Sequence, residues 1–380
     1  MNKFFALTLI ISIVVMLVAC AGGEDLVPPP APTLADDLPP TSEPLPPESQ
    51  VEDVPSNINK TTSGQMAEDE IWRGEILLTG DVEIPQGVTL TIEPRTTIRF
   101  TAQRDDQHGE DEYSPDDPST IHATMISILV FGVLDAHGTP EQPILFTSDS
   151  EAPGVMDWQS IMIEDSGTVR LEHVTIEHGY FGVQLNSPMS TVSVSQSTFR
   201  DITTCAICGH GAHALEGPII ISNNNFIRCG RECIDTYWNQ NIVVQHNVFA
   251  ESYVGIMCVG SAITVEGNLF INNGRGIGII EGGTPNIIGN EFTQQNEGTA
   301  IFVTDASPTI SNNNIYDNFF NFQMEGGSQN VSAPNNWWGS ADPTAIEDSI
   351  LDGRDDPALG ILEFEPYAVE AFQLDVPGYK

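Results

Sequence analysis

A short pattern returns along the second half of this chain and decides its fold. It reads IIISNNNF at 219–226, IVVQHNVF at 242–249, ITVEGNLF at 263–270, NIIGNEF at 286–292 and TISNNNI at 309–315. Further copies occupy 192–199 and 331–337, and a degenerate copy ends at Ile176. Each copy ends on a large apolar anchor, and successive anchors lie about 23 residues apart. Strands this short cannot bury an apolar face alone, so we expect each copy to stack on its neighbours.

Each repeat has a second half that completes one turn of a solenoid. After the anchor and a polar turn comes another alternating run, often led by glycine, as at 182–185, 255–258 and 276–279. Two or three short strands in about 23 residues, without helical periodicity, describe one turn of a β-solenoid, here called a rung. Consecutive rungs should pair in parallel about 4.8 Å apart.

An asparagine stands two residues before the anchor in six successive repeats. These residues are Asn224, Asn247, Asn268, Asn290, Asn313 and Asn335. Asparagine tolerates left-handed backbone in turns, and stacked amides can hydrogen-bond from one rung to the next. We therefore predict an asparagine ladder that runs along the axis of the solenoid.

These repeats and their asparagine column resemble the right-handed parallel β-helix superfamily. The resemblance covers roughly residues 71–340 and implies an all-β fold, a right-handed parallel β-helix (solenoid) with a short C-terminal capping segment. The superfamily includes pectate lyases, alginate-modifying enzymes and many surface proteins, so the resemblance implies polysaccharide as a ligand class without choosing a reaction.

The folded part divides into three predicted sections. Residues 68–168 read as wide, less regular coils, interrupted by an acidic insertion at 104–119 that should project as a loop. Residues 169–340 hold the regular repeats of about 23 residues. Residues 341–380 read as a cap and tail, in which Asp342 caps a short helix that begins at Pro343. That helix should cover the end of the solenoid with three apolar residues, Ile346, Ile350 and Leu351.

The N-terminus predicts export and a lipid anchor. Residues 1–19 hold one positive charge and a short apolar run, which is typical of a signal peptide. The tetrapeptide at 17–20, Leu-Val-Ala-Cys, resembles the bacterial lipobox, which implies cleavage before Cys20 and acylation of that cysteine. Acyl chains would anchor the protein in a lipid bilayer outside the cytoplasm. The expected location is the outer membrane if the cell has one, and otherwise the outer face of the cytoplasmic membrane.

Residues 20–67 are rich in proline and acidic residues and predict a disordered tether. Acidity extends to the whole chain, because 13 Lys+Arg against 53 Asp+Glu give 380 residues a net charge of −40. Such a chain has no cationic face for a phosphate backbone, which excludes a nucleic-acid partner.

The resemblance invites a search for an acid cluster on the outward side of one strand column. Alternation places Gln184, Ile207, Asp235, Met257, Gly278 and Gln323 outside. It places Val183, Leu185, Ala206, Cys208, Ile234, Thr236, Ile256, Cys258, Ile277 and Ile279 inside. Only one of the outward residues is a carboxylate, so a lyase-type cluster is not predicted.

A mixed polar and aromatic patch is the best candidate binding surface. It contains Arg231, Glu232, Asp235, Tyr237, Trp238 and Tyr253. Rings beside carboxylates and guanidinium groups suit sugar stacking and hydroxyl hydrogen bonding. The alternative is a set of solvated turns whose aromatic side chains pack on their neighbours.

The cysteines other than Cys20 suggest a disulfide. Cys205 and Cys233 stand at equivalent positions of adjacent rungs, which suits disulfide geometry, and a Cys205–Cys229 bridge is the competitor. Cys208 and Cys258 read as buried thiols. The run from Cys205 to His213 also contains Cys208 and His210, which is a metal-ligand composition. Strand geometry argues against it, because cysteines three apart on a strand point to opposite faces.

No metal site or cofactor is therefore predicted, and Ca²⁺ at Asp352, Asp355 and Asp356 is the one option kept open. Two functions from different classes remain. The first is a surface lipoprotein that binds extracellular or cell-wall polysaccharide. In its enzymatic version, the protein would also modify that polysaccharide as a lyase, hydrolase or epimerase. The second is a non-catalytic structural or adhesive surface protein. The sequence favours a protein without catalytic activity.

Overall fold

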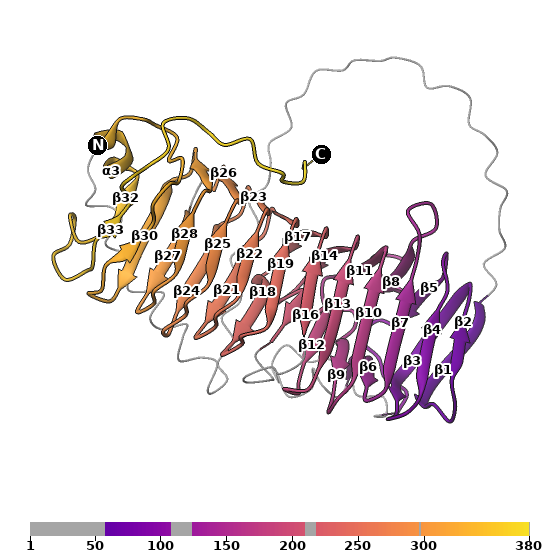
Figure 1. Cartoon of the computed structure of the whole chain (residues 1–380). Coiled ribbons are helices and arrows are strands. Elements are labelled where there is room, and N and C mark those ends of the chain that lie inside the picture. Colours follow the sequence, from indigo (N-terminus) through magenta and orange to yellow (C-terminus); the bar gives the residue numbers. More distant parts are fainter. Residues whose placement is uncertain (1–57, 108–123, 210–217, 296–297, 380) are drawn as a thin grey trace, which may run out of the picture. The chain divides into compact units, whose positions relative to one another are not determined.

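The computed structural model describes residues 58–107, 124–209, 218–295 and 298–379. The strands from Ile58 onward follow one another side by side in sequence order (Figure 1). Each strand pairs in parallel with the equivalent strand of the next rung, which confirms the predicted right-handed parallel β-helix. Among the described helices, none has the length and apolar character that a membrane span requires.

The rungs build three columns of strands. Sheet I consists of β2 (Glu70–Trp72), β4 (Thr89–Ile92), β7 (Val133–His137), β10 (Thr168–Glu172), β13 (Thr191–Ser195), β16 (Ile219–Ser222), β19 (Ile242–Gln245), β22 (Thr264–Glu266), β25 (Asn286–Ile288) and β28 (Thr309–Ser311). Column II consists of β5 (Thr97–Phe100), β8 (Ile144–Ser148), β11 (Val174–Glu177), β14 (Thr198–Ile202), β17 (Asn225–Cys229), β20 (Val248–Ala250), β23 (Leu269–Ile271), β26 (Glu291–Thr293) and β29 (Asn314–Tyr316). Column III consists of β6 (Ser127–Val130), β9 (Ser160–Ile163), β12 (Val183–Leu185), β15 (Ile207–Cys208), β18 (Glu232–Tyr237), β21 (Val254–Val259), β24 (Arg275–Ile280), β27 (Thr299–Thr304), β30 (Phe320–Gly326) and β32 (Ile350–Leu351).

The first rung differs from the later ones because β3 (Glu75–Ile84) serves two columns. Its first half pairs with β5 and its second half with β6. The strand β1 (Ile58–Gln65) pairs with β3 in turn, so ordered structure begins inside the segment predicted as tether. The polar sequence of β1 concealed this strand, because an edge strand can be held by backbone hydrogen bonds without an apolar pattern.

The core is a stack of identical side chains from successive rungs. Anchor rings of column II lie face to face at centroid separations of 5.2, 5.0, 4.7 and 4.5 Å from Phe199 through Phe226, Phe249 and Phe270 to Phe292. All five rings are fully buried. Offset stacking of this kind adds roughly 0.5–1.5 kcal/mol per pair to the gain from burial. The repeated anchors therefore set the register of the solenoid.

The predicted asparagine ladder is present, with one correction. Each ladder amide from Asn224 to Asn313 donates to the side-chain oxygen of the next, at 2.9–3.0 Å. The sixth member is Asn336, whose Oδ1 accepts from both the backbone and the side-chain nitrogen of Asn313. Asn335 instead has φ +59, and the residues before the other ladder members, such as His246 and Asn312, are left-handed too. In each turn, the left-handed residue is thus the one that directly precedes the ladder asparagine.

A second ladder, which the sequence analysis missed, follows the anchors on their other side. Its members are Ser252, Asn273, Gln295 and Asn318, and each of the last three accepts from the backbone N–H of the preceding member at 2.7–3.0 Å. Each stands three residues after an anchor. That spacing in the sequence was the signal that could have revealed it.

The C-terminal cap agrees with the prediction except at Leu351, which pairs with Gln323 and is only partly buried. Asp342 accepts a 3.0 Å hydrogen bond from Thr344 N at the start of α3 (Pro343–Asp348). Ile346 and Ile350 are buried on the end of the core, and β32 pairs with β30 as a final rung strand. The last two short strands, β31 (Val331–Ser332) and β33 (Leu362–Glu363), pair with each other. The cap therefore closes the apolar interior at this end.

Candidate functional site

The predicted polar and aromatic patch lies on the outer face of column III. Strand register aligns Gln184, Cys208, Asp235, Met257, Gly278, Phe302 and Gln323 along its central outward line. The prediction that Ile207 points outward and Cys208 inward is therefore wrong. Ile207 pairs with Val183 and Ile234 in the core, because irregular backbone before β15 shifts the alternation by one residue.

The candidate residues occupy both ends and the middle of β18. Glu232, Asp235 and Tyr237 lie on this strand, where Asp235 is only 6% exposed. Arg231 precedes the strand, and its guanidinium lies 3.6 Å from the Glu232 carboxylate. Trp238 follows it in a left-handed turn, with φ +55.

Two exposed aromatic side chains mark the two ends of this surface. Trp238 is 43% exposed, and its indole lies over the backbone of Gly260 in the next rung, where a Cβ atom would collide with the ring. Tyr253 is 53% exposed and precedes β21, the neighbouring strand. The register places Tyr253 beside Arg231, seven residues before Trp238, so the backbone positions that carry the two rings lie about 23 Å apart along the strand direction. The structure therefore places them as separate contact points and not as one cluster.

The structure adds an apolar centre that sequence reasoning missed. Val259, Ile280 and Phe302 are buried on the outside of column III, and Tyr237 and Met257 pack against them. Phe302 and the Met257 sulfur fill the space beside Gly278, which explains the absence of a side chain there. Outward apolar residues on several adjacent rungs were the available signal.

A polar network borders this centre on the C-terminal side. The Arg275 guanidinium lies 4.2 Å from the Phe302 ring centroid and forms a 2.9 Å ion pair with Glu325. Gln323 donates to Glu325 at 3.3 Å and accepts from Thr299 at 2.7 Å. Arg275 and Glu325 are largely buried, so this network supports the surface and holds its side chains in one arrangement.

A charge ladder follows the turns between columns II and III. Arg228 donates to both Asp201 oxygens at 2.7 and 2.8 Å and lies 3.6 Å from Glu251. The hydrogen bond from Arg228 is the main cause that lowers the pKa of the Asp201 carboxyl below its usual value, and the same bond raises the pKa of Arg228. Left-handed residues at successive turns stack these opposite charges one rung apart.

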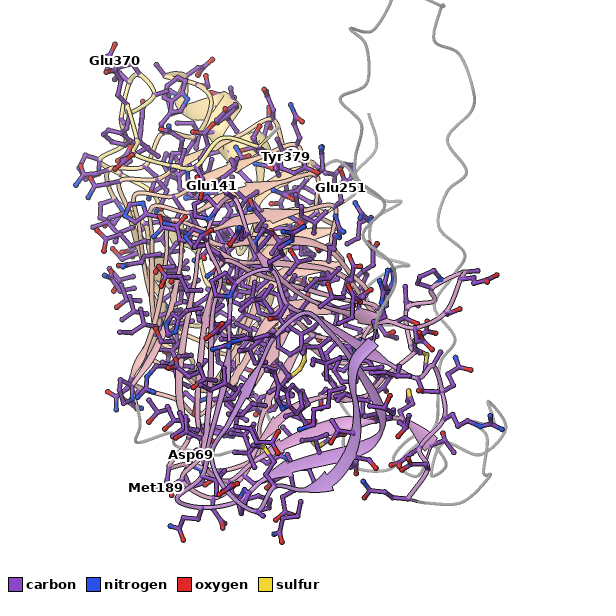
Figure 2. The ribbon with its side chains drawn as sticks, turned by 90° about the vertical axis from the view of Figure 1, so that its right-hand side faces the viewer. Asp69, Glu141, Met189, Glu251, Glu370 and Tyr379 are labelled. Carbon is purple, nitrogen blue, oxygen red and sulfur yellow. A yellow bond between two sulfur atoms is a disulfide. The ribbon has the colours of Figure 1, made fainter. Side chains whose placement is uncertain are left out.

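The C-terminal tail, Ala368–Tyr379, runs back along the outside of the rungs. Phe372 exchanges two hydrogen bonds with the Asn314 side chain, at 2.9 and 3.0 Å. The tail ends where the Tyr379 hydroxyl donates to Glu251 at 2.6 Å (Figure 2). Burial, followed by this hydrogen bond, raises the pKa of Tyr379 to about 12. The tail therefore connects the cap to the charge ladder.

The predicted disulfide is wrong in its pairing. Cys205 is bonded to Cys208, with 5.7 Å between their Cα atoms, and Cys229 and Cys233 are free and buried. Residues three apart on a strand point to opposite faces, but Cys205 lies in irregular backbone before β15, so this rule does not apply to it. Cys258 is a free core thiol as predicted, and burial raises its pKa to about 12.

The remaining predictions concern metals and the termini. No group of three or more metal-ligating side chains occurs within the described ranges, and His210 and His213 lie outside them. The Asp352 carboxylate accepts from Arg354 at 2.6 Å and from Leu362 N at 2.8 Å, so it supports its own turn. The predicted signal peptide, Cys20 and most of the predicted tether also lie outside the described residues, as does most of the predicted acidic insertion.

Comparison with known proteins supports the fold class. Residues 155–292 match the family model described as a right handed beta helix region, which runs from the turn before β9 to β26. The resemblance to the right-handed parallel β-helix superfamily is thereby confirmed. A search of curated proteins and a search of solved structures found no match. Domains of this kind often bind or act on polysaccharides.

Proposed function

We propose that this protein is a cell-surface lipoprotein whose β-helix binds extracellular or cell-wall polysaccharide. The observation that carries the proposal is the outer face of column III, where two exposed rings flank a carboxylate and an apolar centre. Trp238 and Tyr253 supply flat surfaces for sugar rings, and Asp235 lies between them along the strand direction. Arg231 and Glu232 add hydrogen-bonding groups at one end.

The proposed activity is binding without turnover. Glycoside hydrolysis commonly requires two carboxyl groups about 5–10 Å apart on either side of the scissile bond. Between Gln184 and Gln323, the central outward line of column III carries one carboxylate, Asp235. An enzymatic role as a lyase, hydrolase or epimerase is therefore the less favoured version.

Anchoring is the second part of the proposal. The lipobox-like tetrapeptide ending at Cys20 supports acylation, and the proline-rich segment that follows would hold the β-helix away from the bilayer. Metabolic labelling with an alkyne fatty acid tests this directly. We expect label in the wild type and none in Cys20→Ser, which should also leave the membrane fraction. Equal labelling of both would refute the anchor.

The binding proposal is tested on a glycan array with purified wild type and two site variants. Trp238→Asn removes the ring and keeps a residue that tolerates the left-handed turn, and Asp235→Asn removes the charge at nearly constant volume. Ile220→Ala on sheet I removes another exposed apolar side chain, which is 45% exposed, and serves as the control.

We expect at least about tenfold weaker binding in Trp238→Asn, in line with about 1.4 kcal/mol or more for a stacked ring, and no change in Ile220→Ala. Full retention by both site variants would refute the site. Release of oligosaccharide would establish an enzyme. The absence of glycan binding would favour a structural or adhesive surface protein.

A further inference from the structure

We infer that Cys229 and Cys233 form a second disulfide when the exported protein folds. The inference goes beyond carbohydrate binding and uses only the predicted export from the cytoplasm. Among the described cysteines, these two and Cys258 are free, and all three are buried. The Cys229 and Cys233 side chains lie within hydrogen-bonding reach of each other. Cys258 instead donates to Ser261 O at 3.4 Å.

Cys229 occupies the position at which the second ladder would continue toward the N-terminus. It stands three residues after the anchor Phe226, and its backbone N–H donates to Ser252 Oγ at 3.0 Å. In later rungs the side chain at this position ties the turn to the preceding rung. The Asn273 and Gln295 amides donate to backbone carbonyls there at 2.9 and 2.8 Å. A thiol is a weak donor, so Cys229 gives this turn a weaker tie than the amides do.

Cys233 departs from its own column in the same rung. The strand register aligns it with small residues of the neighbouring rungs, which are Ala206, Gly255, Gly276 and Ala300. At Gly255 a Cβ atom would lie 2.8 Å from the Phe270 ring, which explains why this column holds small residues. Cys233 brings a larger side chain to this place and is fully buried. Both departures from the repeat therefore meet across one turn, as two contacting thiols.

The chemistry is the oxidation of two thiols by thiol–disulfide exchange. A bond forms between the two Sγ atoms, each thiol loses its proton, and two electrons pass to the disulfide of an oxidant, which becomes two thiols. Compartments outside the cytoplasm supply such oxidants. Burial is the main cause that raises the pKa of Cys233 well above its usual value. Because the thiolate is the attacking species, the bond should form during folding, before the rung is buried.

The bond would close the turn before β18 over residues 229–233. This segment contains Arg231 and Glu232, which lie at one end of the proposed binding surface. A short covalent loop restricts the backbone of the turn. The disulfide would therefore take over the role that ladder amides have in later rungs, and would hold these two side chains in place for a ligand.

The test is disulfide mapping of the full chain, isolated after export and blocked with iodoacetamide under denaturing, non-reducing conditions. Trypsin cleaves after Arg228 and Arg231, and chymotrypsin cleaves after Tyr237. We expect peptide 229–231 to stay joined to peptide 232–237, about 2 Da lighter than the two thiol peptides together, because two hydrogen atoms are lost. Cys258 should be alkylated. Alkylation of both Cys229 and Cys233 in the exported protein would overturn the inference, as would a bond from either to another cysteine.

Two variants test the effect of the bond on the turn. Cys229→Ser should leave Cys233 open to alkylation and should speed hydrogen exchange of residues 230–232 roughly tenfold, because the turn loses its covalent closure. Cys258→Ser is the matched control, since it removes a buried thiol one rung later, and should change neither the joined peptides nor this exchange. Loss of the joined peptides in Cys258→Ser would overturn the pairing, and equal exchange in Cys229→Ser and wild type would refute the closure. These outcomes do not depend on the glycan array, so either proposal can fail alone.

Discussion

Replacing Asn268 by alanine should break the asparagine ladder at its centre. The Asn268 Oδ1 accepts from the backbone N–H of Asn247 at 2.8 Å and from its amide at 3.0 Å. Its Nδ2 donates to Val244 O, Glu266 O and the Asn290 Oδ1 at 2.9–3.1 Å. Alanine leaves at least the buried Asn247 N–H without an acceptor, which costs about 1–3 kcal/mol. With the other lost hydrogen bonds, we expect a destabilisation of about 3 kcal/mol.

Hydrogen exchange measured by mass spectrometry gives the local readout, since long repeat proteins need not unfold in one step. Segment 242–249, which contains the Asn247 amide, should exchange roughly 30-fold faster at its protected site, as expected for a local loss of about 2 kcal/mol. Asn286→Ala is the matched control, because Asn286 is exposed at the start of β25. It should change stability by less than about 0.5 kcal/mol. Equal effects of Asn268→Ala and Asn286→Ala on exchange and unfolding would refute the role of the ladder.

Three further predictions follow from the turns and the tail. Asn335→Gly should be tolerated, because glycine readily adopts the left-handed φ of this residue. Asn336→Gly should clearly lower the urea midpoint of unfolding, because it removes a ladder hydrogen bond. Similar midpoints for the two variants would contradict the placement of the ladder at Asn336. Arg228→Asn should raise the pH at which the protein unfolds in acid. Arg228 lowers the pKa of Asp201 in the folded state, which stabilises the fold at pH values above the unfolded-state pKa, and this stabilisation is lost as the pH falls through the folded-state pKa. An unchanged acid midpoint would contradict this. Tyr379→Phe should make the C-terminal tail about fivefold more sensitive to chymotrypsin at neutral pH, in line with the loss of about 1 kcal/mol when its hydrogen bond to Glu251 is removed. Equal cleavage of wild type and variant would contradict the contact.

The repeat pattern allowed more of the fold to be predicted than of the site. Stacked copies must present equivalent residues at equivalent places, so Phe226, Phe249 and Phe270 could be aligned and placed in the core from their spacing in the sequence. The prediction failed where a rung departs from the repeat. Irregular backbone before β15 reversed Ile207 and Cys208. At the last repeat the anchor position belongs to the buried Trp338, because Trp337 pairs with Asn314, and this places the ladder at Asn336 in place of Asn335.

The site was predictable only as a set of residue types. Arg231, Asp235 and Trp238 were named from composition on adjacent rungs, but their exposure and partners depend on which side chains lie above and below them. Arg275 and Phe302 could not be assigned to the same surface, because they belong to later rungs than β18 and meet only through stacking.

The sequence by itself determined that this chain winds into stacked parallel rungs, because a repeat of about 23 residues with strands too short to bury a face has few other ways to form a core. Only the tertiary structure decided which cysteines pair, which turn residues are left-handed and which guanidinium groups are already engaged. Those outcomes depend on distances between neighbouring rungs of a few ångströms, and a shift of one residue in a turn moves a side chain from the core to the surface.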